Sequence, residues 1–154
     1  MLYNKVMKDY EQKARDLFTS GYNCAQSTFC TFADDLGIDL ETALKLSSSF
    51  GGGMGRLREV CGAVSAMLMI AGLKKGYITN NNDEIKEKHY QLIQDLAEEF
   101  KKENKTIICR ELLGLPEGAD SPTPSKRTEQ YYQERPCEDI VASAVKIIKE
   151  KLLN

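Results

Sequence analysis

The sequence predicts an all-α fold: a compact bundle of about six or seven helices around a central apolar helix at about 61–74, with a long Pro-rich loop at 116–136. Apolar residues recur at helical spacing over nearly the whole chain, whereas few windows alternate with the period of two that a half-buried strand shows. A length of 154 residues suits one domain with a substantial core. We therefore expect a single helical domain over 1–154.

Composition and charge exclude several classes of protein. A hydrophobic share of 42% and a charged share of 29% are ordinary for a globular domain, which excludes disorder over the whole chain. The formal net charge of −2 argues against the broad basic face of a nucleic-acid-binding protein. No stretch reaches the roughly 18 to 20 apolar residues of a membrane span, and the polar, helix-like segment 1–10 lacks the apolar run of a secretory signal. We expect a cytoplasmic protein that neither inserts into membranes nor binds nucleic acid.

Three helices are predicted in the first third of the chain. Apolar residues recur at helical spacing from Tyr10 until Gly21 ends the first helix. Asn23 is a favourable N-cap for a second helix, from about Cys24 to Leu36, which ends at the following glycine. Asp39 can cap a third helix in the same way.

The predicted central helix follows a glycine-rich break. Gly51–Gly55 contains four glycines in five residues, which carry a large backbone entropy cost in any helix. The next helix begins near Cys61 and ends between Gly72 and Gly76. Because it is apolar on nearly every side, we expect it at the centre of the bundle.

The second half of the chain is predicted to contain three more helices. Asp83 can cap a long helix that runs to about Lys102. Thr106 can cap a short helix over Ile107–Leu113, and a final amphipathic helix begins at Cys137.

Pro116–Pro136 contains all four prolines of the chain and is predicted to be a loop. Loops of this length are usually functional or disordered. Tyr131 and Tyr132 could fold over a site as a lid, or they could anchor the loop.

The unusual feature of the composition is its five cysteines: Cys24, Cys30, Cys61, Cys109 and Cys137. In the cytoplasm, several cysteines more often bind metal or act in redox chemistry than form structural disulfides. None of their spacings is the short C-x-x-C motif of zinc ribbons, thioredoxin-like sites or ferredoxins. A shared site must therefore be assembled by tertiary folding.

Four of the cysteines fall close to predicted helix starts. Cys24, Cys61 and Cys137 lie at or near N-termini, and Cys109 lies in the first turn of the short helix. Unpaired N–H groups and a partial positive charge stabilise a thiolate there, so we expect thiols with pKa values below about 8.5. The competing interpretation is that these free cysteines are small buried hydrophobes that only pack.

Cys61 is the first candidate for a nucleophile, because Arg56 and Arg58 precede it and favour its thiolate. Both arginines could equally be solvated. Gly51–Gly55 could cradle an anion with backbone N–H groups, but it matches neither of the glycine motifs that bind nucleotides. We interpret it as a tight turn that lets backbone approach the Cys61 thiol.

Cys30 and His89 are interpreted as packing residues. Cys30 follows Cys24 by six residues on the same helix, so the two thiols point to different sides. His89, the one imidazole, shares a helical stripe with Ile85 and Leu92, which favours partly buried packing over metal ligation.

Five ordered blocks of the sequence carry a resemblance: Gly21–Gln26, Phe50–Gly55, Val60–Ala66, Ile108–Gly114 and Pro136–Cys137. Together they resemble the C_GCAxxG_C_C family, which is described as redox-active proteins. Position by position, the family's cysteines fall on Cys24, Cys61, Cys109 and Cys137. The last glycine of the family's Cys-Gly block is Ala66 here, a departure that leaves every thiol in place.

The resemblance implies redox activity in which Cys24, Cys61, Cys109 and Cys137 are catalytic. Our first hypothesis is an oxidoreductase that uses these four thiols for thiol–disulfide or electron-transfer chemistry. The second is a metal-binding module in which the same cysteines hold Zn²⁺ or an iron–sulfur cluster. The third is a helical interaction protein whose core thiols are inert. The wide spacing of the cysteines favours the first hypothesis, and the redox partner, the disulfide pairing and the oligomeric state stay open.

Overall fold

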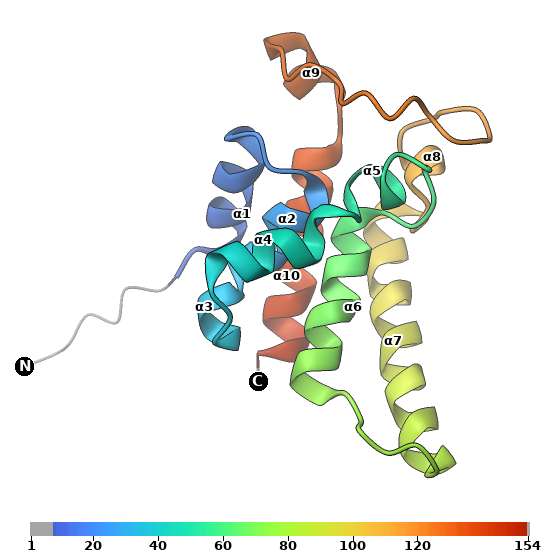
Figure 1. Ribbon diagram of the computed structural model, residues 1–154. Coiled ribbons are helices and arrows are strands. Elements are labelled where there is room, and N and C mark those ends of the chain that lie inside the picture. Colours follow the sequence, from blue (N-terminus) through green and yellow to red (C-terminus); the bar gives the residue numbers. More distant parts are fainter. Residues whose placement is uncertain (1–7, 154) are drawn as a thin grey trace, which may run out of the picture.

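Helices make up the regular secondary structure of the computed structural model, which describes residues 8–153 (Figure 1). Their bounds are α1 (Tyr10–Thr19), α2 (Cys24–Thr31), α3 (Ala33–Leu36), α4 (Leu40–Ser48), α5 (Gly51–Met54), α6 (Gly62–Lys75), α7 (Asp83–Asn104), α8 (Cys109–Leu112), α9 (Glu129–Glu134) and α10 (Cys137–Leu152). These described residues contain no strand, only a single β-bridge between Val60 and Ile108. The all-α prediction is confirmed. The helix-like segment expected before Tyr10 falls largely on residues 1–7, which lie outside the described residues.

The second predicted helix is two helices in the structure. The Asn23 side chain accepts a hydrogen bond from the N–H of Gln26, whose side chain accepts one from the N–H of Asn23, so a capping box starts α2. The prediction of one helix to Leu36 is wrong, because the chain turns at Phe32 between α2 and α3. The Phe32 side chain is fully buried and stacks on Tyr10 with ring centroids 5.0 Å apart, so core packing fixes the turn.

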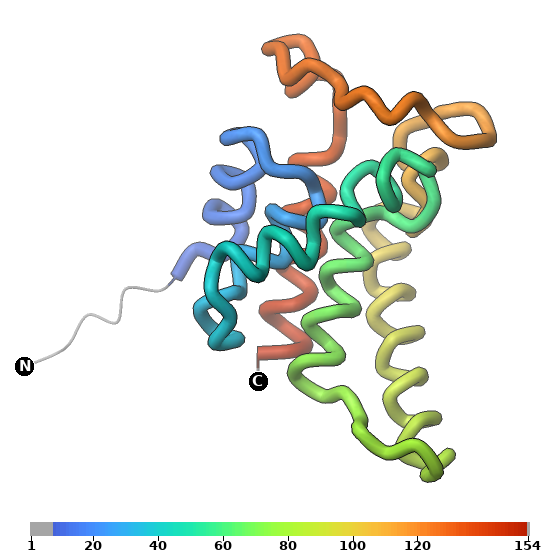
Figure 2. The backbone as a smooth tube through the Cα atoms, viewed as in Figure 1, coloured from blue at the N-terminus to red at the C-terminus, as the bar shows by residue number. Residues whose placement is uncertain are grey.

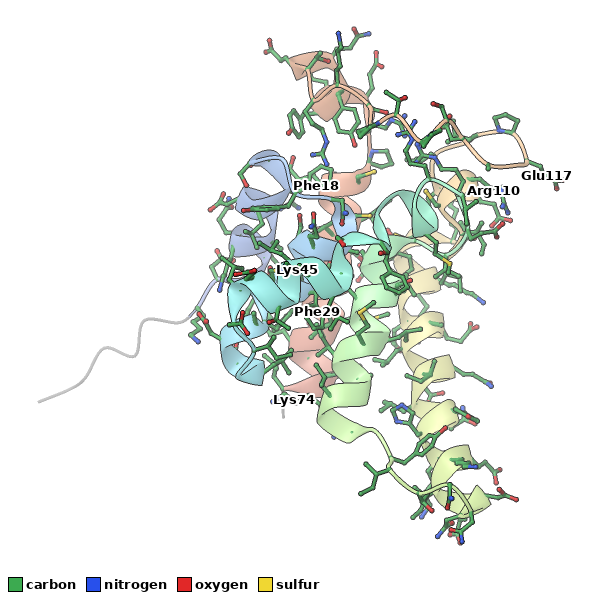
Figure 3. All side chains as sticks on the ribbon, in the orientation of Figure 1. Phe18, Phe29, Lys45, Lys74, Arg110 and Glu117 are labelled. Atoms are coloured by element: carbon green, nitrogen blue, oxygen red, sulfur yellow. The ribbon has the colours of Figure 1, made fainter. Side chains whose placement is uncertain are left out.

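The apolar helix α6 packs against α2, α10 and α7 (Figure 2). Its fully buried side chains are Ala63, Val64, Ala66, Met67, Ile70 and Ala71. Figure 3 shows Phe29 of α2, which is fully buried, among the helices at the middle of the bundle. The expectation of burial on nearly every side fails in the last turn of α6, where Leu73 is 55% exposed.

Two of the predicted N-caps differ from those in the structure. Asn82 caps α7 rather than Asp83, because the Asn82 side chain accepts a hydrogen bond from the N–H of Ile85. Thr106 does not cap α8. Its hydroxyl oxygen instead accepts a hydrogen bond from the N–H of Ile108, inside the turn that precedes the helix.

The short helix α8 begins at Cys109 instead of Ile107, because the preceding residues pair with the segment before α6. The N–H of Cys61 donates to the carbonyl oxygen of Ile107 at 2.8 Å, and the N–H of Cys109 donates to that of Glu59 at 2.6 Å. In a helix starting at Ile107, the carbonyl oxygen of Ile107 would accept a hydrogen bond from the helix instead of from Cys61. The pairing holds the starts of α6 and α8 side by side.

The predicted Pro-rich loop at 116–136 is interrupted by one short helix, α9, which the hydroxyl of Thr128 caps. The rest of this segment forms no helix and runs from α8 to α10 (Figure 2). The final helix α10 begins at Cys137, as predicted.

Candidate functional site

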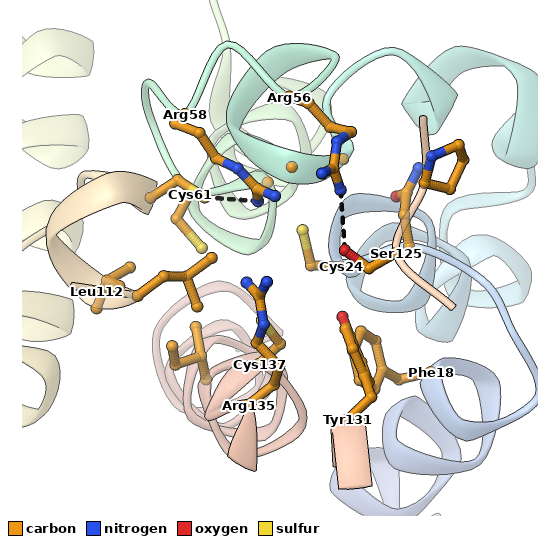
Figure 4. A pocket seen from close by; sticks show the side chains of 18 of the residues that line it. Phe18, Cys24, Arg56, Arg58, Cys61, Leu112, Ser125, Tyr131, Arg135 and Cys137 are labelled. Atoms are coloured by element: carbon orange, nitrogen blue, oxygen red, sulfur yellow. Dashed lines mark hydrogen bonds between the residues drawn. The ribbon is translucent and has the colours of Figure 1, made fainter. Parts of the chain in front are cut away.

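Four cysteines from four parts of the chain line one cavity of about 200 Å³ (Figure 4). Cys24, Cys109 and Cys137 are the first residues of α2, α8 and α10, and Cys61 immediately precedes α6. Each of them therefore stands at a helix start, where the sequence analysis expected it. All of them are free thiols.

A glycine allows the Cys24 thiol to reach the start of α6. A Cβ atom added to Gly62 would lie 2.6 Å from the Cys24 Sγ and 2.6 Å from the carbonyl oxygen of Phe50. Real side chains do not approach that closely, so α2 and α6 meet here only because residue 62 has no side chain.

We expect Gly62→Ala to lower the free energy of unfolding by about 1–3 kcal/mol, because the new methyl group overpacks this contact. Gly72→Ala, in the same helix, is the matched control, since a Cβ atom there meets nothing within 4 Å. The free energy of unfolding of that variant should rise by about 0.5–1 kcal/mol, because alanine has a higher helix propensity than glycine. Urea denaturation measures both, and equal stability of the two variants would show that the close approach is not a constraint.

The segment Gly51–Gly55 forms the tight turn that we expected, with left-handed φ angles of 68° at Gly52 and 69° at Gly53. A Cβ atom on Gly53 would lie 2.7 Å from the Cβ of Cys109. The absence of a side chain at Gly53 therefore lets the backbone approach Cys109. The close approach to the Cys61 thiol that we expected is not among the nearest contacts of these glycines.

Burial raises the pKa values of three of the cavity thiols. The pKa of Cys61 lies well above its usual value, that of Cys24 is raised, and that of Cys137 is raised to about 11. Backbone N–H groups at the starts of α2 and α6 lower the pKa values of Cys24 and Cys61, but burial outweighs them. The prediction of lowered pKa values at these helix starts is wrong, because the loss of hydration disfavours a thiolate more than the N–H groups favour it.

The neighbouring sulfurs add to the effect of burial and raise these pKa values further. Cys24 and Cys109 raise the pKa of both Cys61 and Cys137, and Cys109 raises that of Cys24. The four thiols therefore form one electrostatic group, in which a negative charge on one sulfur disfavours charge on the others. Cys24 and Cys109 each interact with all three of the other sulfurs.

A buried guanidinium contacts one of the four sulfurs. Arg58 is 5% exposed, and its Nη1 donates to the Cys109 Sγ at 3.6 Å. Its Nε and Nη2 donate to the Oδ2 of Asp120 at 3.3 and 3.0 Å. Burial lowers the pKa of Arg58, but the hydrogen bonds to Cys109 and Asp120 raise it above its usual value. Arg58 is thus neither solvated nor the partner of Cys61 that we expected, because its guanidinium contacts the Cys109 sulfur instead.

Residues 120–135, here called the strap, are fastened across the cavity. At one end, Arg56 forms an ion pair with Asp120 at 3.2 Å and donates to the Ser125 hydroxyl at 3.2 Å, drawn as a dashed line in Figure 4. Further along, Arg127 donates to the carbonyl oxygen of Phe18 at 3.0 Å, and its guanidinium lies 4.3 Å from the centre of the Phe18 ring.

The two tyrosines of the strap, Tyr131 and Tyr132, make different contacts. Tyr131 lines the cavity, whereas the Tyr132 hydroxyl donates to the carbonyl oxygen of Thr19 and anchors the strap to α1. Sequence reasoning missed Asp120, Arg127 and Arg135, which also belong to the strap. They lie in a polar segment without helical periodicity, so no pattern distinguished them from solvated residues.

Cys30 and His89 lie away from the four-cysteine cavity. Cys30 is 2% exposed and belongs to the hydrophobic core. His89 is partly buried between α6 and α7, where its ring meets that of Tyr77 edge-on at 5.6 Å. Its Nδ1 has no hydrogen-bond partner within the described residues.

Residues 8–153 lack the arrangements that metal ligands and membrane-spanning helices require. No group of three or more His, Cys, Asp or Glu side chains in this range is arranged so that it could hold a metal ion. In the described residues, Cys24, Cys61, Cys109 and Cys137 are therefore not arranged as a preformed set of metal ligands. In the same range, no helix is both long enough and apolar enough to cross a membrane.

The fold and the site define a class of helical protein in which four free cysteines, each at a helix start, share one cavity. The family model described as "Putative redox-active protein (C_GCAxxG_C_C)" matches residues 22–151, and the chain belongs to this family. The resemblance noted in the sequence is thereby confirmed, and the match includes all four cavity cysteines. No curated protein and no solved structure matches the chain.

Proposed function

We propose that this protein is a thiol–disulfide oxidoreductase in which two cavity thiols, Cys109 and Cys24, cycle between dithiol and disulfide. The observation that carries the proposal is the convergence of four free cysteines on one cavity in which Arg58 contacts the Cys109 sulfur. We also propose that the protein works in a reducing compartment such as the cytoplasm, because thiols stay reduced there.

Cys109 acts as the attacking group, because its sulfur is the one that the Arg58 guanidinium contacts, and an electropositive neighbour is typical of the reactive cysteine in disulfide exchange. Its thiolate attacks one sulfur of a substrate disulfide, forms a mixed disulfide and releases the other substrate sulfur as a thiolate. The partners of Arg58 support this role, because its remaining N–H groups are fixed by Asp120 and its charge stays at the Cys109 sulfur.

Cys24 acts as the resolving thiol. Its raised pKa disfavours a second thiolate in the cavity before the mixed disulfide forms. It then attacks the Cys109 sulfur, loses its proton and displaces the second substrate thiol. Overall the protein dithiol loses two electrons and two protons, and the substrate disulfide becomes two thiols. Cys61 and Cys137 form the second pair, which relays oxidation from the first.

The alternative proposal is a metal-binding module, and one observation favours it: neighbouring sulfurs raise the pKa values of Cys24, Cys61 and Cys137. A cation among the sulfurs would reverse that effect and stabilise their thiolate forms. Zn²⁺ or an iron–sulfur cluster would use the same four side chains.

One experiment separates these proposals. Protein purified without air is analysed for metal, and native thiols are counted before and after mild oxidation with a small disulfide. We expect metal-free protein whose five free thiols fall by two, or by four once the second pair is also oxidised, with a mass decrease of two or four hydrogen atoms. Stoichiometric zinc or iron would favour the metal-binding module instead. Unreactive thiols in metal-free protein would refute both proposals and leave the interaction protein with inert thiols.

A further inference from the structure

The charges around the cavity point to the chemical class of its substrate. In the described part of the chain, the cavity wall contains four arginines and neither an aspartate nor a glutamate. Arg56 and Arg58 share one carboxylate, that of Asp120, at 3.2 and 3.0 Å. Arg127 and Arg135 complete the set. One negative charge is therefore set against four positive charges, which favours an anionic ligand in the cavity.

Arg135 is the arginine best placed to bind such a ligand. The donors of Arg58 are occupied by Cys109 and Asp120, and Arg127 donates to backbone carbonyl oxygens. Among residues 8–153, Arg135 forms no ion pair, and its guanidinium lies over the ring of Tyr131 at 5.6 Å. Figure 4 shows this guanidinium directed into the cavity from the side opposite Arg56 and Arg58.

The size and covering of the cavity restrict the ligand further. Its volume of about 200 Å³ is comparable with the ~150 Å³ cavity that admits a benzene molecule. The strap is held on both sides of the cavity by the ion pair of Asp120 and by the hydrogen bonds of Arg127. A small molecule fits this arrangement, whereas a disulfide on the surface of a folded protein would meet the strap first.

We propose that the substrate is a low-molecular-weight disulfide that carries carboxylate groups, and that Arg135 binds one carboxylate while the Cys109 sulfur attacks the disulfide. This inference rests on the proposed thiol–disulfide function. A guanidinium binds a carboxylate through two parallel N–H···O bonds, which orients as well as attracts the ligand. The protein dithiol loses two electrons and two protons, and the substrate leaves as two carboxylate-bearing thiols.

The test compares three small disulfides that differ mainly in charge. Reduced protein is mixed without air with 3,3′-dithiodipropionate, bis(2-hydroxyethyl) disulfide or cystamine, which carry carboxylates, hydroxyls and ammonium groups respectively. The rate of thiol loss is followed, and mixed disulfides are identified by mass. We expect the acidic disulfide to react about tenfold faster than the neutral one, and the cationic disulfide to react slowest.

Substitution of Arg135 tests the binding residue. In Arg135→Gln, the ratio of acidic to neutral rates should fall about tenfold, and Arg135→Lys should restore part of it, because a lysine keeps the charge but not the fork geometry. Arg15→Gln is the matched control: it removes one arginine that pairs with Asp139 at 2.7 Å and does not line the cavity, so its ratio should equal that of the wild type. Thermal unfolding verifies that each variant is folded.

The outcomes separate the two levels of the proposal. If none of the three disulfides oxidises the protein, the proposed function itself fails. If all three oxidise it at similar rates, the thiol–disulfide function stands and the inference of an acidic substrate is overturned. If the acidic disulfide is preferred equally by wild type and Arg135→Gln, the assignment of Arg135 is wrong.

Discussion

Cys109→Ser is expected to slow the formation of mixed disulfides with small disulfides by about 100-fold or more, because a hydroxyl cannot replace the attacking thiolate. Among the cavity sulfurs, Cys109 is the one that Arg58 contacts, at 3.6 Å, whereas burial raises the pKa values of Cys24, Cys61 and Cys137. The rate is measured under exclusion of air by quenching with acid and counting protein-bound substrate by mass.

Two comparisons make this expectation specific. Cys30→Ala removes a buried thiol that does not line the cavity, so its reaction rate should match that of the wild type. Cys24→Ser should still form the mixed disulfide but accumulate it, because the resolving thiol is missing. Loss of reactivity in Cys61→Ser together with normal reactivity in Cys109→Ser would transfer the attacking role to Cys61 and contradict our assignment.

The reduced protein is expected to lose stability steeply in alkaline solution, with Cys137 alone accounting for about 3 kcal/mol. Burial raises the pKa of Cys137 to about 11, whereas an unfolded chain releases this proton near pH 8.5. Between these values the folded state binds more protons than the unfolded state, so the free energy of unfolding falls as the pH rises. The contribution is fully present below about pH 8.5 and is lost as the pH reaches about 11. The raised pKa values of Cys24 and Cys61 act in the same direction.

Urea denaturation between pH 8 and pH 11, with reductant and without air, measures this dependence. Lysines and tyrosines also titrate in this range, so the informative quantity is the difference between wild type and Cys137→Ser. The variant should lose about 3 kcal/mol less than the wild type over the same pH interval. Parallel stability curves for the two proteins would mean that the Cys137 thiol ionises as easily in the folded state as in the unfolded chain.

The all-α fold and the starts of α2 and α10 could be predicted from the sequence, whereas the start of α8 could not. Asn23 caps α2 with Gln26, as the neighbouring residue types indicate, and Cys137 follows Pro136 at the start of α10. Such signals act over three or four residues, so a single sequence contains them. Where a distant contact intervened, the prediction failed. Phe32 ends α2 early through its packing on Tyr10.

The composition of the site could be predicted only in part. The cysteines were visible from their positions and from the family resemblance, whereas the strap residues Asp120, Arg127 and Arg135 lie in a segment without a periodic pattern. Arg58 was named from its closeness in sequence to Cys61, yet its guanidinium contacts Cys109, which is 51 residues away. A left-handed backbone at Arg58, with φ of 60°, belongs to the turn that directs this side chain.

Local residue order thus determined the helical fold and the start of α2 at Cys24, because capping and helix propensity depend on neighbours along the chain. The start of α8 at Cys109 also needed the pairing with the segment before α6. Tertiary folding decided which sulfur contacts a guanidinium and which three thiols have pKa values raised by burial. The reason is that hydration and electrostatic attraction depend on every atom within a few ångströms, and most of those atoms belong to residues far away in the sequence.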